Sequence, residues 1–122
     1  MKRLVAEGFL LLLGTEFLML ARGFPALHAW VQGRAIGRAT RLQADVICHA
    51  MDVACVFYPK RVLCLQRSVS TAIFLRRHGV PAEMVIGAQM LPFKSHAWVE
   101  VGGVVVSDKP YMHEIYRELE RC

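Results

Sequence analysis

The sequence predicts an α+β fold, with helices in its first half and a small antiparallel β-sheet in its second half. Two segments, residues 41–58 and 64–78, place apolar residues at the spacing of one helix face. Further along, the pattern changes to alternation and β-branched residues, which favours strands. The chain has 122 residues, 55% of them hydrophobic, which suffices for one core but not for a second. We therefore expect a single domain over residues 1–122, with 1–38 an N-terminal helical extension and 39–122 the core.

The N-terminal extension is leucine-rich and opens with Met1-Lys2-Arg3, which superficially resembles a secretion signal. The small residues that follow have the wrong spacing for a cleavage site. Gly14 followed by Thr15 predicts a break between two short helices, with Thr15 as an N-cap. The apolar run from Gly8 to Thr15 is too short to span a bilayer. We expect both helices to pack on the core. One alternative is that they form a face that binds a membrane surface or a partner protein, and another is that the segment is a signal sequence.

The two predicted helices have clear ends. The segment 41–58 ends before Pro59, because proline cannot continue a helix. Its apolar positions at core spacing are Leu42, Val46, Ile47, Met51 and Ala54. The segment 64–78 has a basic last turn, and Gly79 suits the left-handed position after a helix. Cys64 therefore begins this helix, where free amide N–H groups and the positive end of the dipole would stabilise a thiolate.

The strand region is expected to contain a hairpin. A first strand is predicted around Ala82 to Ile86, and the hairpin runs from His96 to Asp108 with its turn at Gly102-Gly103. A two-residue turn would place Asp108 on the face opposite His96, unless Asp108 lies beyond the strand, because side chains alternate. We therefore predict a three-residue turn over residues 101–103, or a bulge, which puts both side chains on one face.

Cys64, His96 and Asp108 are the candidate catalytic residues. A thiolate at a helix start is a nucleophile, an imidazole can take or share its proton, and a carboxylate can orient the imidazole. Each residue alone has an ordinary explanation, as a buried cysteine, a solvated histidine or a turn aspartate. Their joint placement favours a thiol triad, with the amide N–H of Cys64 as the first oxyanion donor.

The block from Cys64 to Asp108 contains CLQRS, GVPA, a VIG strand and HAWVEVGG. It resembles the lasso-peptide leader peptidases, the peptidase part of the lasso B protein, which resemble transglutaminase-like cysteine proteases. The resemblance covers residues 40–115. It implies a papain/transglutaminase-like core, in which a nucleophile-bearing helix packs on the sheet. It also implies cleavage of a ribosomally made precursor peptide between leader and core, before a separate lasso cyclase closes the macrolactam.

Several other residues receive narrower predictions. Tyr58 is a candidate oxyanion donor, because it precedes Cys64 by the interval at which related thiol hydrolases often carry a polar donor. Trp98 is a candidate substrate or oxyanion residue, with core packing as the alternative. Glu100 is expected to pair at the surface. Arg67 is expected to brace the fold through a carboxylate, with substrate contact as the alternative.

The remaining cysteines do not indicate a metal site. Cys48 and Cys55 are further apart in sequence than the paired ligands of zinc clusters, so we expect core thiols, no metal and no cofactor. Cys122 is expected to be exposed and prone to oxidation. Four cysteines without a persuasive secretion signal predict reduced thiols and a cytoplasmic location, with membrane association through the N-terminal helices as the alternative.

A net charge of +5 suits an acidic partner, but the arginines are scattered and the aromatic residues are few, so no nucleic acid is expected. In the family that this chain resembles, the longer members carry an N-terminal domain that recognises the leader. This chain shows no such domain, so the resemblance implies a separate leader-recognition protein as a partner. Two other classes of function stay open, a catalytically silent module that binds a leader or serves as a scaffold, and an acyl transferase of the same fold.

Overall fold

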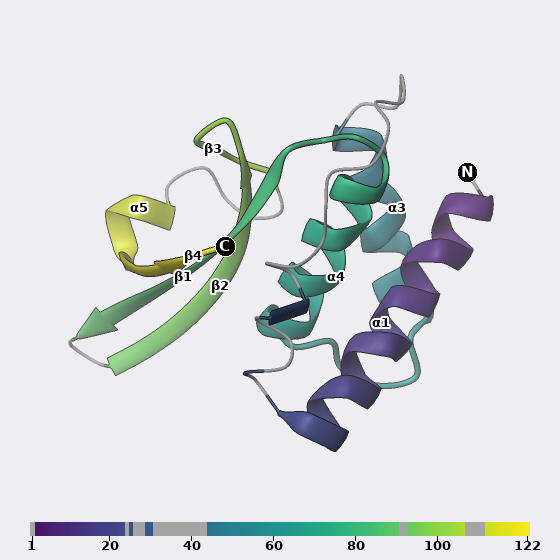
Figure 1. The fold of residues 1–122 in the computed structure, drawn as a ribbon, viewed down its shortest axis with the longest axis horizontal. Coiled ribbons are helices and arrows are strands. Elements are labelled where there is room, and N and C mark those ends of the chain that lie inside the picture. Colours follow the sequence, from purple (N-terminus) through teal and green to yellow (C-terminus); the bar gives the residue numbers. More distant parts are fainter. Residues whose placement is uncertain (1, 24, 26–28, 31–43, 91–92, 107–111) are drawn as a thin grey trace.

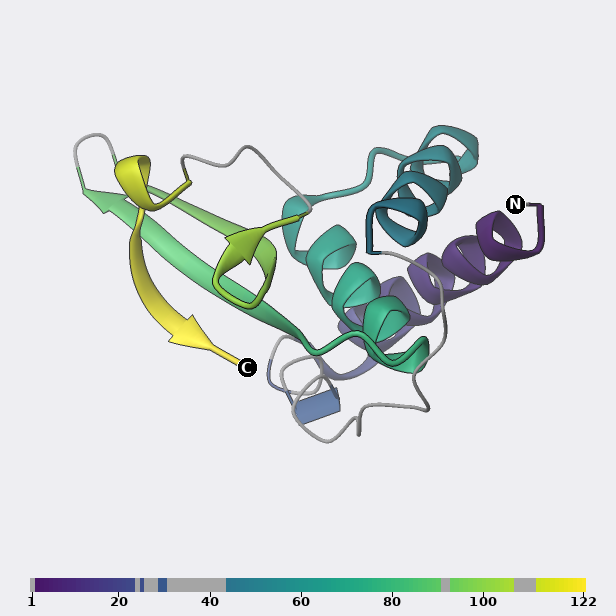
Figure 2. The ribbon, with the colours of Figure 1, turned by 90° about the horizontal axis from the view of Figure 1, so that it is seen from above.

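The structure is a computed structural model that describes residues 2–23, 25, 29–30, 44–90, 93–106 and 112–122. Three helices lie on one side of a four-stranded antiparallel sheet (Figures 1 and 2). Helix α4 (Cys64–Arg77) lies between the sheet and the other two, α1 (Lys2–Arg22) and α3 (Ala44–Phe57). The predicted α+β arrangement, with the cysteine-bearing helix against the sheet, is therefore confirmed.

Helices α3 and α4 follow the predicted boundaries closely. Helix α3 ends at Phe57, shortly before Pro59, and α4 is followed by Gly79 at φ +84°, the left-handed conformation expected there. The predicted core positions of α3 that are fully buried are Ile47, Met51 and Ala54. Val46 is half-buried, and Leu42 lies outside the described residues.

Helix α1 is one continuous helix of 21 residues, so the predicted break at Gly14 and Thr15 is wrong. The hydroxyl of Thr15 does not cap a new helix. It donates a hydrogen bond to the carbonyl of Leu12 at 2.9 Å, one turn earlier, and lies 3.1 Å from the hydroxyl of Ser70 on α4. The helix instead ends at Arg22, and Gly23 follows it with a φ of +78°, which does not continue the helix.

The length of α1 also corrects the expectation of a short apolar run. Its 21 residues have a mean hydropathy of 1.9 over the most apolar stretch, so in length and composition it could cross a membrane. One face of α1 is nevertheless buried in the protein core. Its buried residues are Gly8, Leu11, Leu12 and Thr15. A core helix and an N-terminal signal meet the same criterion of length and hydropathy, so the criterion alone does not place α1 in a bilayer.

The sheet has the strand order β3-β2-β1-β4. Its strands are β1 (Ala82–Met90), β2 (Phe93–Val101), β3 (Val104–Val105) and β4 (Arg117–Arg121), and the short helix α5 (Met112–Ile115) precedes β4. Strand β1 is longer than predicted, and β4 was not predicted. Because β4 pairs with the free side of β1, the end of the described chain completes the sheet.

The turn between β2 and β3 has two residues, so the predicted three-residue turn is wrong. Val101 pairs with Val104 and Glu100 with Val105, without a bulge. Gly102 and Gly103 have φ of +59° and +82°, as a turn with two left-handed positions requires.

The two faces of the sheet are packed differently. The face that includes Ala82, Met84 and Val99 packs with the helices in the main core. The other face carries a smaller cluster of Val85, Trp98 and Met112, to which Val105 and Tyr116 add. This second cluster lies beside one candidate site residue, His96.

Candidate active site

Cys64 is the first residue of α4, as predicted. Leu63 precedes it in an extended conformation (φ −80°, ψ 157°) and makes no side-chain cap. The first amide N–H groups of an uncapped helix are available to other acceptors. Cys64 itself is exposed. A thiol at this position is both accessible and next to amide donors that no side chain of Leu63 caps.

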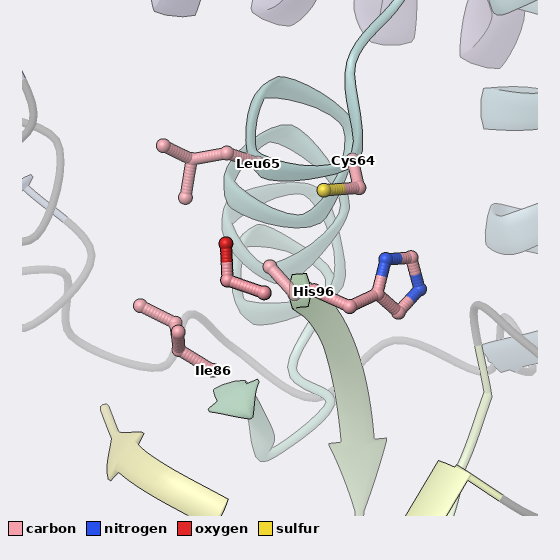
Figure 3. A pocket seen from close by; sticks show the side chains of 6 residues that line it. Cys64, Leu65, Ile86 and His96 are labelled. Carbon is pink, nitrogen blue, oxygen red and sulfur yellow. The ribbon is translucent and has the colours of Figure 1, made fainter. Parts of the chain in front are cut away.

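His96 lies within β2, opposite Gly87 of β1, and not at the strand start that was predicted. In register it shares a face with Trp98, away from α4. It still borders a pocket of about 270 Å³ together with Cys64, and Figure 3 shows both side chains there. The other lining residues are Leu65, Ile86, Ser95 and Ala97. Among the described residues β3 pairs only with residues 100 and 101 of β2, so His96 can reach the pocket around the strand edge.

The structure thus brings two of the three predicted residues to one cavity. Within the described part of the chain no hydrogen bond joins the Cys64 thiol to the imidazole of His96. Catalytic hydrogen bonds are often long in substrate-free sites and tighten when substrate binds. The arrangement can support thiol chemistry in which an imidazole exchanges a proton with the sulfur.

The imidazole of His96 packs against two aromatic rings, which also contact each other. The ring of Trp98 lies at 6.2 Å from it, centroid to centroid, with an angle of 28° between the planes. The ring of Tyr116, just before β4, lies at 5.4 Å with an angle of 30°. Trp98 is fully buried, and its Nε1–H donates to Glu100 at 2.7 Å. In this structure Trp98 therefore supports His96, and its N–H is already used by Glu100.

Comparison with known proteins identifies the family. The family model described as transglutaminase-like superfamily matches residues 11–121. The chain belongs to the transglutaminase-like superfamily. Over 51 residues it is also 43% identical to the microcin J25-processing protein McjB of Escherichia coli. That match covers 42% of this chain but only 24% of the relative, and no solved structure matches the chain.

The third predicted member of the transglutaminase-like triad, Asp108, lies outside the described residues. The two-residue turn removes the register by which we expected residue 108 to pair with residue 96. The role of Asp108 in orienting His96 therefore stays a prediction, now without support from the hairpin.

Tyr58 is engaged elsewhere in this transglutaminase-like domain. Its hydroxyl donates to the carboxylate of Glu16, and its ring packs on Phe9 at 5.5 Å. Burial and this hydrogen bond raise the pKa of Tyr58. Lys60, 2.6 Å from Glu16, and Tyr58 together lower the pKa of Glu16. The tyrosine is not among the residues that line the Cys64 pocket, so its predicted oxyanion role finds no support here.

The prediction that Arg67 braces the fold is confirmed, because its guanidinium pairs with Asp52 and ties α4 to α3.

The expected core location of Cys48 is also confirmed, and burial raises the pKa of its thiol to about 11. Cys55 is half-buried. Cys122 is half-buried rather than exposed, because its backbone pairs with Met84, and burial raises its pKa too.

Sequence reasoning missed two residues beside the site. Glu100 was expected at the surface but is 1% exposed. The alternation of β2 could have indicated its place, because His96, Trp98 and Glu100 are each two residues apart and must share a face. Tyr116 had no comparable signal, since its approach to His96 depends on the pairing of β4 with β1.

Proposed function

We propose that the protein is a cysteine peptidase that removes the leader from a ribosomally synthesised lasso-peptide precursor. The observation that carries this proposal is the position of Cys64 at the uncapped start of α4, in one pocket with His96. Membership of the transglutaminase-like superfamily and the similarity to a microcin J25-processing protein support a role in lasso-peptide processing.

The proposed reaction begins when His96 takes the proton of the Cys64 thiol. The thiolate attacks the scissile carbonyl, and the tetrahedral oxyanion forms next to the amide N–H of Cys64. The C–N bond then breaks as the imidazolium gives its proton to the leaving amine of the core peptide. A thioester to the leader remains on Cys64. Water, deprotonated by His96, hydrolyses it and restores the thiol.

The electrostatics of the site fit this sequence of steps. The first-turn amides of α4 carry the partial positive charge of the helix dipole, and no side-chain cap at Leu63 competes for them. An oxyanion that develops next to these amides accepts their hydrogen bonds, as a capping side chain would otherwise do. In the proposed mechanism Asp108 orients His96, and the partners are a separate leader-recognition protein and the lasso cyclase.

The test is mass spectrometry of a lasso precursor incubated with this protein and a leader-recognition protein. We expect two fragments with the wild type and intact precursor with Cys64→Ala. Cys55→Ala is the matched control, because Cys55 lies on α3 and does not line the Cys64 pocket. Cleavage that persists in Cys64→Ala would refute the mechanism. An intact precursor that still binds the wild type would favour a silent scaffold, and a mass increase equal to an added amine would favour acyl transfer.

A further inference from the structure

Glu100 is a buried carboxylate beside the candidate site, and among the described residues it accepts hydrogen bonds from Trp98 and Arg121. Its Oε2 accepts a hydrogen bond from Trp98 Nε1 at 2.7 Å, and its Oε1 accepts one from Arg121 Nη2 at 3.1 Å. Burying a charge is costly unless it is paired and hydrogen-bonded. An apolar side chain would fill this position at lower cost. The carboxylate therefore needs an explanation beyond packing.

Trp98 connects this carboxylate to the candidate base. The indole hydrogen bond to Glu100 fixes the polar edge of the ring, while the face of the ring stacks on His96 at 6.2 Å. The ring also lies directly over Gly87, where a Cβ would come within 2.7 Å of Trp98 Cη2. The indole is therefore held by a hydrogen bond at one edge and by backbone below it, which leaves it little freedom to turn.

Arg121 holds the far side of Glu100. It lies at the end of β4 and contacts three carboxylates, of Glu83 at 3.6 Å, Glu100 at 3.1 Å and Glu118 at 2.5 Å. The hydrogen bond to Glu118, followed by that to Glu100, raises the pKa of Arg121, so it is a permanent cation. Tyr116 on the same segment packs against both His96 and Trp98. The segment from residue 112 to 121 thus adds Met112 and Tyr116 to the cluster around Trp98 and His96.

We propose that Glu100 and Arg121 are positioning residues, which lock the indole of Trp98 so that the stacked imidazole of His96 is held at the Cys64 pocket. This inference rests on the proposed role of His96 as the base for Cys64. It goes further by assigning the orientation of that base to the ion pair of the buried Glu100 with the partly exposed Arg121, on the face of the sheet opposite α4. In this arrangement Arg121 holds Glu100 in place. Glu100 in turn fixes the indole of Trp98, and the indole holds the imidazole of His96.

The experiment measures the alkylation rate of Cys64 by iodoacetamide from pH 5 to 9, with the modified residue identified by mass spectrometry. This readout needs no peptide substrate. The variants are Glu100→Gln, Arg121→Met and Trp98→Phe, which keeps a ring but removes the N–H donor. His96→Ala defines the rate without the base. Glu7→Gln is the matched control, because Glu7 is also an ion-paired glutamate but lies at α1, paired with Arg77 and His78.

We expect Glu100→Gln and Trp98→Phe to lower the alkylation rate at neutral pH by about tenfold or more, toward that of His96→Ala, because small displacements of a catalytic group are costly. Circular dichroism should show a folded protein, and Glu7→Gln should match the wild type. With a cleavable precursor, kcat should fall while KM stays constant.

Two results would contradict the inference in distinguishable ways. If folded Glu100→Gln and Trp98→Phe both keep the wild-type pH profile while His96→Ala loses it, the positioning role is wrong and the proposed function stands. If His96→Ala itself keeps the wild-type profile, then His96 does not act on Cys64, and both proposals fail. If Glu100→Gln does not fold, Trp98→Phe alone decides between these results.

Discussion

At the scale of single residues, the site depends on a glycine that neither binds nor reacts. Gly87 is the residue opposite His96, and its missing side chain makes room for the ring of Trp98. A Cβ there would come within 2.9 Å of both Trp98 Cζ3 and the Cβ of Tyr116. It would also come within 2.7 Å of Trp98 Cη2, so two of the three contacts are to the indole ring, which is fully buried. The ring of Trp98, which stacks on His96, therefore fits at this position because residue 87 is glycine.

We expect Gly87→Ala to reduce Cys64 alkylation and precursor cleavage by at least tenfold, because the displaced indole takes His96 with it. It should also lower the free energy of unfolding by about 1–3 kcal/mol, the usual cost of overpacking. Urea denaturation and the alkylation assay measure the two effects. Gly14→Ala is the control, since among the described residues its Cβ would meet Trp30 at 3.8 Å, an ordinary van der Waals contact. Equal behaviour of the two variants would contradict this account.

The buried thiol of Cys48 makes stability depend on alkaline pH. Burial raises the pKa of this thiol from 9.0 to about 11, so the folded state holds its proton more tightly than the unfolded state. The resulting stability is fully present below about pH 9 and is lost as the pH rises toward 11.

We therefore expect the wild type to lose more stability than Cys48→Ala between pH 8 and pH 10.5, by about 1–3 kcal/mol. Urea unfolding under reducing conditions at both pH values measures the difference. Cys48→Ala will be less stable overall, because it leaves a cavity, so only the change with pH is diagnostic. Identical pH dependence of the two proteins would show that the thiol titrates alike in both states.

At the scale of elements, the connection between α1 and α4 is a buried polar contact. Thr15 and Ser70 are both fully buried, and their hydroxyl oxygens lie 3.1 Å apart. Gln66 of α4 adds a hydrogen bond to the carbonyl of Leu12 at 2.9 Å. These contacts fix how α1 lies along the helix that carries Cys64.

A double-mutant cycle tests this contact. Thr15→Val should cost about 1–3 kcal/mol, because it leaves the buried hydroxyl of Ser70 without its partner. Adding Ser70→Ala should cost less than its effect in the wild type, which gives a coupling energy of about 1 kcal/mol. Urea unfolding of the four proteins measures it. Strict additivity would mean that the two hydroxyls do not interact in solution.

The sequence predicted well those elements whose limits depend on neighbouring residues, such as regular apolar spacing or a glycine that ends a helix. Helix α4 has regular apolar spacing and a glycine stop, so its limits and the position of Cys64 were correct. The break at Thr15 was wrong because the hydroxyl has a long-range partner, Ser70, that outweighs local capping. The hairpin turn was wrong because we required His96 and Asp108 to share a face. Strand β4 depends on pairing across the sheet, which has no local signal, whereas the alternation of β2 did carry a signal for the face on which Glu100 lies.

At the scale of the whole molecule, α1 has a second apolar face that the core does not cover. Its exposed members are Leu10, Leu13, Phe17 and Leu20, spaced as one side of a helix. Basic residues lie at both ends, Lys2 and Arg3 at the start and Arg22 at the end. The acidic residues Glu7 and Glu16 are occupied by ion pairs with other elements.

We expect this face to bind vesicles that contain anionic lipid, as an apolar helix face with basic ends does. The double variant Phe17→Ser with Leu20→Ser should lose most of this binding in a sedimentation assay. Val56→Ser, a similarly exposed residue on α3, is the control. Binding that is absent in the wild type, or unaffected by the double variant, would show that the face has another role or none.

The place of β4 in the sheet also has a consequence for biosynthesis. Strand β1 pairs with β4, and Tyr116 and Arg121 on that segment complete the surroundings of His96. A nascent chain that has already released Cys64 and His96 from the ribosome still lacks these groups. Folding of the site must therefore wait until residue 121 has emerged. In the proposed mechanism, the thiol of Cys64 therefore gains its positioned base only after this late segment has been synthesised.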